Sequence, residues 1–383
     1  MGSLRDTLTS YVDDGSVAGA IGLIARGDQI DAQAVGSVDV EGSAPMRRDS
    51  IFRLASATKP ITAAALMMLI DDGRLALTDP IANWLPELAA PRVVRTPAGP
   101  VDDLVPANRP ITVFDLLSFH AGYGLAADFS LPALQLLLDK AQRNTRDPKL
   151  APGPDEWLAI LADIPMISQP GEAWLYNTGS DLQGVLIARV AGQPLPEFLA
   201  ERLFEPLGMV DTGFSVPAAK LGRFTSYYQP DEDGKLELLD TPDGQWSTPS
   251  VFASGAGGLV STADDWLRFA RLILAKGTVD GRRFLSPESV RAMTTDHTTP
   301  AERAANTVFL EGQGWGFGGS VDVETINPWN VPGRYGWVGG SGTAAHLIPS
   351  TGKVTIVLTQ TQMTNPSPTP IMRAFWRHAA TVG

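Results

Sequence analysis

The segment Ser56-Ala57-Thr58-Lys59 carries two residues that could together attack a carbonyl group. A serine hydroxyl is a weak nucleophile until a neighbouring base takes its proton. The segment opens an apolar run over residues 60–70 that is typical of a buried helix, and residues three apart on a helix share one face. Burial of the helix start would lower the pKa of the Lys59 amine and make it a base. We therefore expect Ser56 to be a nucleophile at the start of a helix, within reach of Lys59.

A second Ser-x-x-Lys segment, Ser350-Thr351-Gly352-Lys353, is predicted to have no catalytic role. Its turn residues stand between two apolar runs, 344–348 and 354–358, which favours an exposed hairpin tip. The tetrapeptide is short enough to arise by chance, so the assignment of Ser56 depends on the rest of the chain.

Two further motifs carry a resemblance to a known family. A Pro-Gly turn at 170–171 leads through an aromatic stretch to Tyr176, and residues 335–343 read Tyr-Gly-Trp-Val-Gly-Gly-Ser-Gly-Thr. In the order and spacing of these motifs, the chain resembles the serine β-lactamase and penicillin-binding-protein superfamily, especially class C β-lactamases and the family VIII carboxylesterases. Residues 113–122 and 255–265 match the same family, and the resemblance spans about residues 51–358.

The resemblance implies a role for each matched residue. Tyr176 would be catalytic together with Ser56 and Lys59, and the N–H groups of Ser56 and Gly340 would form the oxyanion hole. Trp337-Val338-Gly339 stands where β-lactamases carry Lys-Thr-Gly and fits the Trp-x-Gly of the esterases. Class C β-lactamases usually have asparagine at the position of Thr178. The residues expected to contact substrate are Trp337, Gly339, Thr178 and Tyr123, the last directly after the rim segment 113–122.

Other kinds of active site find little support in the sequence. The Gly-x-Ser-x-Gly turn of an α/β-hydrolase is absent, since residues 339–343 end in threonine. The histidines, His120, His297, His346 and His378, form no His-x-x-x-His pair, and there are no cysteines, so no metal is expected. Neither a phosphate-binding loop nor a dinucleotide fingerprint is present, and no cofactor is expected.

Composition is that of a globular enzyme of 383 residues, 44% of them hydrophobic. A net charge of -12 argues against nucleic acid as a partner. The N-terminus has no apolar leader and no run is long enough to cross a bilayer, so we expect a cytoplasmic protein without membrane contact. A small-molecule ester is the expected partner, and the oligomeric state is left open.

The order of apolar patterns predicts an α/β (α+β) fold of the β-lactamase-like kind, an antiparallel sheet flanked by N- and C-terminal helices. Helices are expected at 4–12, 131–140, 182–190 and 371–380, and strands at 18–25, 30–38 and within 344–360. Residues 1–74 and 251–383 would form the sheet domain, with 75–250 inserted as a mainly helical domain. Residues 91–110 and 227–248 are expected to be irregular surface loops.

These motifs predict a serine hydrolase that forms an acyl-enzyme, most simply a carboxylesterase for small uncharged esters. Trp337 offers an apolar face where a β-lactamase lysine would meet a substrate carboxylate. A β-lactamase or D-aminoacyl peptidase, a linear or cyclic amide hydrolase, an acyltransferase and a catalytically silent homologue remain as alternatives. The sequence leaves open whether Lys59 or Tyr176 is the formal base, because coupled groups titrate as a pair.

Overall fold

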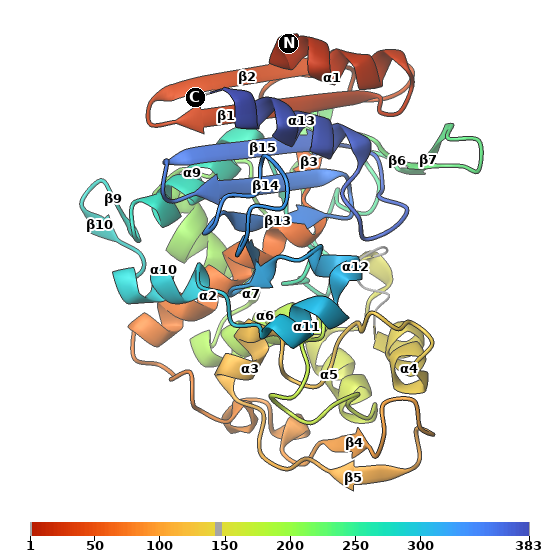
Figure 1. Ribbon diagram of the computed structural model, residues 1–383, viewed down its shortest axis with the longest axis vertical. Coiled ribbons are helices and arrows are strands. Elements are labelled where there is room, and N and C mark those ends of the chain that lie inside the picture. The colour runs from red at the N-terminus through yellow and green to blue at the C-terminus, as the bar shows by residue number, and fades with distance from the viewer. Residues whose placement is uncertain (1, 142–147, 383) are drawn as a thin grey trace.

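A seven-stranded antiparallel sheet forms one end of the molecule (Figure 1). The computed structural model describes residues 2–141 and 148–382. Neighbouring strands pair so that Leu23 lies between Ala32 and Ile356. In spatial order the strands are β11 (Gly314–Trp315), β12 (Ser320–Val321), β13 (Tyr335–Gly339), β14 (Thr343–Ile348), β15 (Lys353–Thr359), β1 (Gly19–Arg26) and β2 (Gln29–Gly36). The strands of this sheet thus come from both ends of the chain.

Helices cover both faces of the sheet and fill the rest of the molecule. Their bounds are α1 (Leu4–Asp13), α2 (Lys59–Asp71), α3 (Val113–Ser118), α4 (Pro132–Ala141), α5 (Pro154–Ala162), α6 (Thr178–Ala191), α7 (Leu195–Leu199), α8 (Glu205–Leu207), α9 (Ala263–Leu274), α10 (Pro287–Met293), α11 (Pro300–Ala305), α12 (Thr307–Leu310) and α13 (Pro370–Thr381). In the described parts of the chain, no helix is both long enough and apolar enough to cross a membrane.

The alternation of side chains along the strands builds a separate apolar layer on each face of the sheet. Ala20 and Ile24 of β1 face helices α1 and α13, whereas Ile21 and Leu23 join the larger cluster with α2 and α9. Gly22 lies on the first face, where a Cβ atom would stand 2.9 Å from Leu8 and 3.2 Å from Phe375. A glycine there lets α1 and α13 pack closely on the strand.

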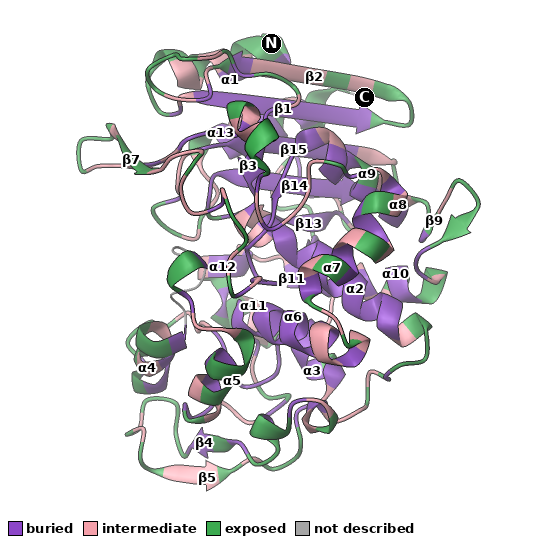
Figure 2. Cartoon of the chain, turned by 180° about the vertical axis from the view of Figure 1, so that it is seen from behind, coloured by how far each residue is buried: buried purple, intermediate pink, exposed green. Residues whose placement is uncertain are grey.

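Helix α2 runs through the middle of the protein and is buried along almost its whole length (Figure 2). Every residue from Lys59 to Leu69 is buried, as expected for a helix that is apolar on all sides. It packs against α6, a helix of the mainly helical half of the chain. The main hydrophobic cluster is continuous from the sheet into that half.

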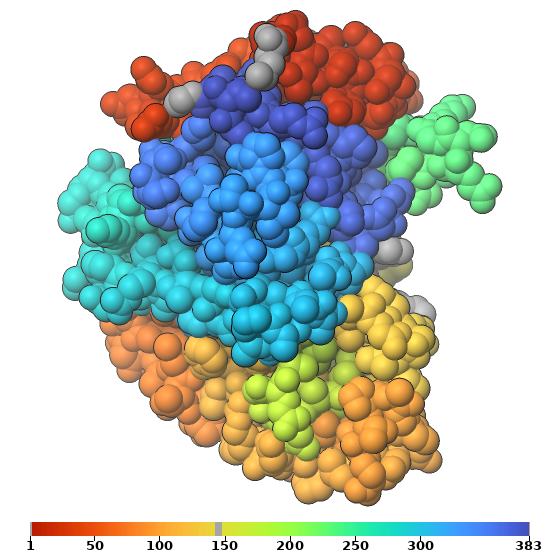
Figure 3. All heavy atoms as spheres, viewed as in Figure 1, coloured from red at the N-terminus to blue at the C-terminus, as the bar shows by residue number. Residues whose placement is uncertain are grey.

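Within residues 2–141 and 148–382, four pairs of short strands lie outside the main sheet. They are β3 (Phe52–Arg53) with β8 (Val260–Ser261), β4 (Arg92–Val94) with β5 (Leu104–Pro106), β6 (Tyr227–Pro230) with β7 (Leu236–Asp240), and β9 (Thr278–Val279) with β10 (Arg282–Arg283). The β6–β7 hairpin projects from the side of the molecule (Figures 1 and 3).

The predicted fold class is confirmed, and most predicted elements lie within a few residues of the observed ones. The expectation that 91–110 and 227–248 are irregular is wrong, since each contains a paired strand. Helix α6 also begins at Thr178, four residues before the predicted start. The division into a sheet domain and an inserted helical domain stays a prediction.

Candidate active site

Ser56 lies in a single 3-10 turn, Ala55–Thr58, that leads directly into α2. Ala55, the residue before it, has a φ of 44°, in the left-handed region that residues other than glycine seldom adopt. Such backbone conformations persist where the surroundings enforce them, and they cluster at functional sites. Ser56 is partly exposed, whereas Lys59 is completely buried. The nucleophile candidate is therefore accessible while its candidate base is shielded from water.

The amine of Lys59 is held between the serine and a backbone carbonyl. Its Nζ lies 2.8 Å from Ser56 Oγ and donates to the Ala256 carbonyl oxygen over 2.7 Å. The N–H of Ala256 in turn donates to Asp181 Oδ1 over 3.1 Å, and Ser254 Oγ donates to the same oxygen over 2.6 Å. Burial lowers the pKa of Lys59 to about 7, while the negative charge of Asp181 acts in the opposite direction. A large fraction of the amine is thus neutral near pH 7.

Tyr176 completes the polar cluster around Ser56. Its hydroxyl accepts a hydrogen bond of 2.6 Å from Trp337 Nε1, and Lys59 Nζ lies 4.8 Å from the centre of its ring. Burial raises the pKa of Tyr176 to about 12, and hydrogen bonds with Ser56 and Trp337 partly offset this rise. The phenol is therefore protonated at neutral pH. Asn177, the next residue, has a φ of 82°, so the backbone is again forced into an unusual conformation beside a candidate catalytic group.

A cluster of aromatic side chains packs around Tyr176. Phe309 of α12 stacks on the tyrosine at 5.0 Å, and Trp174 stacks on it at 5.9 Å. Trp315 makes an edge contact of 4.8 Å with Trp337. Such offset and edge contacts stabilise aromatic clusters beyond the burial of their area. The cluster excludes water from the phenol and fixes the indole that donates to it.

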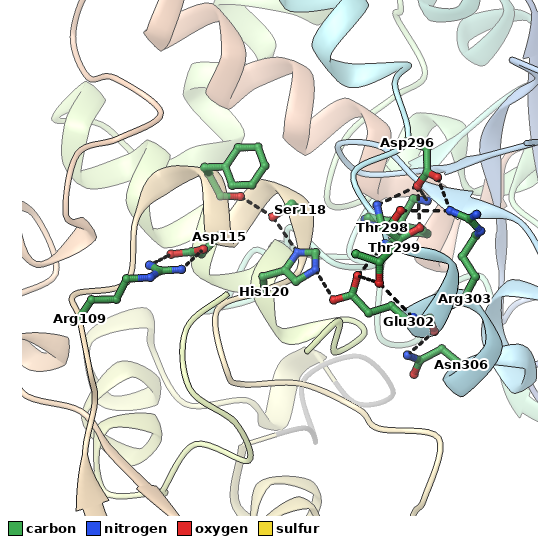
Figure 4. A network of polar contacts seen from close by, with 12 residues as sticks. Arg109, Asp115, Ser118, His120, Asp296, Thr298, Thr299, Glu302, Arg303 and Asn306 are labelled. Carbon is green, nitrogen blue, oxygen red and sulfur yellow. Dashed lines mark hydrogen bonds and ion pairs between the residues drawn. The ribbon is translucent and has the colours of Figure 1, made fainter. Parts of the chain in front are cut away.

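A network of polar contacts joins two segments that contribute to the aromatic cluster (Figure 4). One is the segment around His120, and the other is helix α11 with the residues next to it. His120 Nε2 lies 2.8 Å from Glu302 Oε1, and His120 Nδ1 lies 3.0 Å from Ser118 Oγ. Glu302 also caps the start of α11 through Thr299. His120 follows Phe119, and α11 leads into the helix that carries Phe309. The contact between His120 and Glu302 thus links the segment that carries Phe119 to the helices that precede and carry Phe309.

The β13–β14 hairpin is tied tightly to the segment that precedes Ser56. Thr343 Oγ1 donates to the Leu54 carbonyl over 2.8 Å, and Ser341 Oγ donates to the Arg53 carbonyl over 2.5 Å. A Cβ atom on Gly339 would overlap the Leu54 carbonyl oxygen, so only glycine fits there. Gly340, just after it, is exposed, with open space where a side chain would stand. The structure thus places the Gly340 turn against the nucleophile segment, and its role in an oxyanion hole stays a prediction.

The remaining predicted residues differ in how they relate to the site. Thr178 is buried in the first turn of α6, two residues after Tyr176. Tyr123 is buried in the main hydrophobic cluster rather than in the aromatic cluster around Tyr176. Ser350 lies in the exposed turn between β14 and β15, as expected of the second Ser-x-x-Lys segment.

Sequence reasoning missed the residues that surround the Ser56, Lys59 and Tyr176 group. Asp181 and the Ala256 carbonyl, which support Lys59, are not among the predicted site residues, although Ala256 lies in the segment 255–265 that matches the family. Phe309 and Trp315 were not predicted either. No local spacing in the sequence signals the contact of Asp181 with Ala256 or that of Tyr176 with Phe309, because each joins segments more than 70 residues apart.

Comparison with known proteins identifies the family. A family model described as Beta-lactamase matches residues 4–377 of the chain. The chain belongs to this beta-lactamase family. The resemblance seen in the motifs is thereby confirmed.

Relatives of this beta-lactamase family member include proteins of different organisms. Protein Rv1367c of Mycobacterium tuberculosis is 39% identical over 92% of this chain and 88% of its own. Esterase EstB of Burkholderia gladioli is 32% identical over 79% of this chain and 74% of its own. Among solved structures, EstCE1, described as a hydrolase with promiscuous acyltransferase activity, superposes with a TM-score of 0.82 at 24% identity, covering 98% of this chain and 97% of that one. At this level of identity, the likeness to EstCE1 shows that the two chains share a fold and no more.

Proposed function

We propose that this beta-lactamase family member is a serine hydrolase, and more narrowly a carboxylesterase for small uncharged esters. The observation that carries the proposal is the placing of Ser56 Oγ 2.8 Å from the amine of Lys59, whose pKa burial lowers to about 7. The family relationship and the name of the EstB relative support it.

In the proposed acylation step, Ser56 Oγ attacks the ester carbonyl carbon while neutral Lys59 takes the hydroxyl proton. The negative charge on the carbonyl oxygen is met by the N–H groups of Ser56 and Gly340. The phenol of Tyr176, protonated at neutral pH, gives its proton to the departing alkoxide and recovers one from the Lys59 ammonium. An alcohol leaves and the acyl group stays on Ser56.

In the proposed deacylation step, a water molecule attacks the acyl-enzyme carbonyl and loses its proton to Lys59. Collapse of the intermediate breaks the bond to Ser56 Oγ, which takes up the proton as it leaves. The carboxylic acid product is released and Ser56 and Lys59 return to their starting states. We assign Lys59 as the base in both steps and Tyr176 as the proton donor, and their oppositely directed pKa shifts support this assignment.

The preference for uncharged esters rests on how Trp337 is bonded. An indole has one N–H donor, and that of Trp337 is given to Tyr176. Trp337 therefore has no donor left for a substrate carboxylate. In β-lactamases a lysine at this position of the strand binds that carboxylate. Arg334, the nearest cation in sequence, has its guanidinium over the ring of Trp376 of α13, on the other face of the sheet. The aromatic cluster instead offers an apolar wall.

The test is a substrate panel with matched controls. We expect p-nitrophenyl acetate and butyrate to be turned over with much higher kcat/KM than a chromogenic cephalosporin or a D-aminoacyl amide. Ser56→Ala should abolish turnover, and Ser350→Ala should leave it unchanged. Intact-mass analysis after a phosphonate inhibitor should show one adduct, on Ser56. Equal efficiency on the cephalosporin would favour a β-lactamase, and product esters formed on addition of an alcohol would favour an acyltransferase.

A further inference from the structure

Four buried polar atoms beside helix α13 have no hydrogen-bond partner within the described chain. They are Arg334 Nη2, His346 Nδ1, Thr355 Oγ1 and Trp376 Nε1. Buried donors and acceptors are nearly always paired, so each exception calls for a physical cause. All four belong to the face of the sheet that packs on α13, the face opposite the one that packs on α2.

The residues that carry these atoms line two adjoining hollows, His346 the first, Thr355 the second, and Arg334 and Trp376 both. The hollows hold about 420 and 460 Å³ of empty space, open solvent included, and they share Trp329, Arg334 and Trp376. They lie between α13 and the loop that joins β12 to β13, two segments that meet at the front of the molecule (Figure 3). The wall of the larger hollow is mostly apolar and includes Ile348 and Ala379.

Arg334 places a positive charge in the wall that the two hollows share. It is only 2% exposed, and its guanidinium lies 5.0 Å from the ring centre of Trp376. Its nearest anion is Asp322, whose Oδ2 lies 3.6 Å from Nη1, beyond hydrogen-bond distance. The oxygens of Asp322 instead accept from Gln313 Nε2 over 2.5 Å and from the Val331 N–H over 3.1 Å. The buried ion pair with Asp322 meets the charge on the side of Nη1, whereas Nη2 is left without a hydrogen-bond acceptor within the described chain.

We propose that the larger hollow binds a small monocarboxylate with an apolar tail. The carboxylate would accept hydrogen bonds from Arg334 Nη2 and Trp376 Nε1, and the tail would lie against Ile348 and Ala379. A guanidinium suits a planar carboxylate. The neighbouring Asp322 disfavours anions of higher charge, and the Lys353 amine at the rim is already bonded to carbonyls at the end of α13. The larger hollow is lined by none of the residues assigned to the reaction, although Phe309 and Trp337 of the aromatic cluster line the smaller one. The proposal does not depend on the reaction proposed at Ser56.

The test uses the fluorescence of Trp329 and Trp376, which line the hollow. The purified chain is titrated with sodium butyrate, and with 1-butanol, butylammonium chloride and sodium sulfate as controls for tail and charge. We expect a saturable change with butyrate alone. No saturable change, or an equal one with butanol, would overturn the proposal.

Three variants test whether butyrate binds in the larger hollow. Arg334→Gln should raise the dissociation constant for butyrate at least about tenfold, as loss of a charge-assisted hydrogen bond implies. Ala380→Leu, at an exposed position on the rim, should also abolish binding, and it decides the matter if Arg334→Gln does not fold. Arg377→Gln, an exposed arginine of the same helix outside the two hollows, is the matched control and should bind as the wild type does. Unchanged affinity in Ala380→Leu would overturn the proposal.

Discussion

At the scale of single residues, burial rather than a strong ionic partner makes Lys59 a candidate base. The amine contacts a hydroxyl and a carbonyl oxygen, and the charge of Asp181 only partly offsets its desolvation. Desolvation disfavours the ammonium, so the pKa falls to about 7. The same burial keeps the phenol of Tyr176 protonated. One apolar setting thus produces a proton acceptor and a proton donor on either side of Ser56.

Removal of the Lys59 amine or of the Tyr176 hydroxyl should slow the chemical step. We expect Lys59→Ala and Tyr176→Phe each to lower kcat by about 10² or more, the usual contribution of a general acid or base. Because the groups pass one proton between them, their losses should not add. Burst and steady-state kinetics of the two single variants and the double variant provide the measurement. A double variant that loses the product of the two factors would contradict the shared proton path.

Asp181 should set the pH at which the enzyme becomes active. A neutral Lys59 is required, so kcat/KM of the wild type should rise with pH through about 7. The charge of Asp181 favours the ammonium and raises the lysine pKa. Asp181→Asn should therefore move the midpoint of the rise to lower pH.

The control for this prediction is Ser254→Ala, which removes a hydrogen bond to Asp181 but keeps its charge. It should leave the midpoint close to that of the wild type. The pH profile of kcat/KM for p-nitrophenyl acetate measures both variants. A midpoint that stays in place, or rises, in Asp181→Asn would show that this charge does not act on Lys59.

At the scale of elements, the sequence predicted those helices and strands that a run of apolar residues marks locally. The apolar run after Ser56 predicted α2, and the runs on either side of Ser350 predicted β14 and β15. The hairpin β6–β7 was missed although its Asp233-Gly234 turn is a recognised hairpin signal. Pro230 and the polar residues around it obscured the strand pattern. The aromatic cluster could not be predicted, because residues 119, 174, 309, 315 and 337 meet only through the tertiary fold.

The β6–β7 hairpin is attached to the nucleophile segment by a buried ion pair. Arg53, three residues before Ser56, pairs with Asp240 of β7 at 2.5 Å, and their side chains are 3% and 9% exposed. The guanidinium also lies 4.1 Å from the ring centre of Phe224. This pairing holds a surface element against the strand that leads to the site.

Asp240→Asn should therefore destabilise the protein by about 3–5 kcal/mol, since it leaves a buried charge without its partner. Asp103→Asn breaks the ion pair with Arg95, whose members are 49% and 59% exposed. That control should cost about 1 kcal/mol or less. Urea unfolding followed by circular dichroism measures both. Similar losses in the two variants would mean that the buried pair contributes no more than a surface one.

At the scale of the whole molecule, two structural halves contribute to one site. The sheet half provides β13 with Trp337, and the mainly helical half provides Tyr176 and Asp181. Ser56 and Lys59 stand where α2 passes between them, in contact with both β13 and α6. The geometry of the candidate site thus depends on the packing of α2, and packing on both halves is consistent with a helix that is apolar on every side.

The net charge of -12 gives the molecule a field that also bears on substrate choice. A negative field lowers the local concentration of anionic substrates and leaves neutral ones unaffected. Salt shortens the reach of this field from about 30 Å at about 0.01 M to about 8 Å at about 0.15 M. We expect kcat/KM for an anionic aryl ester, such as a carboxyphenyl acetate, to rise as salt is added across this range. For p-nitrophenyl acetate, which is neutral, kcat/KM should stay constant. A fall for the anionic ester would mean that the field at Ser56 is positive, and the proposed preference for uncharged esters would then need another cause.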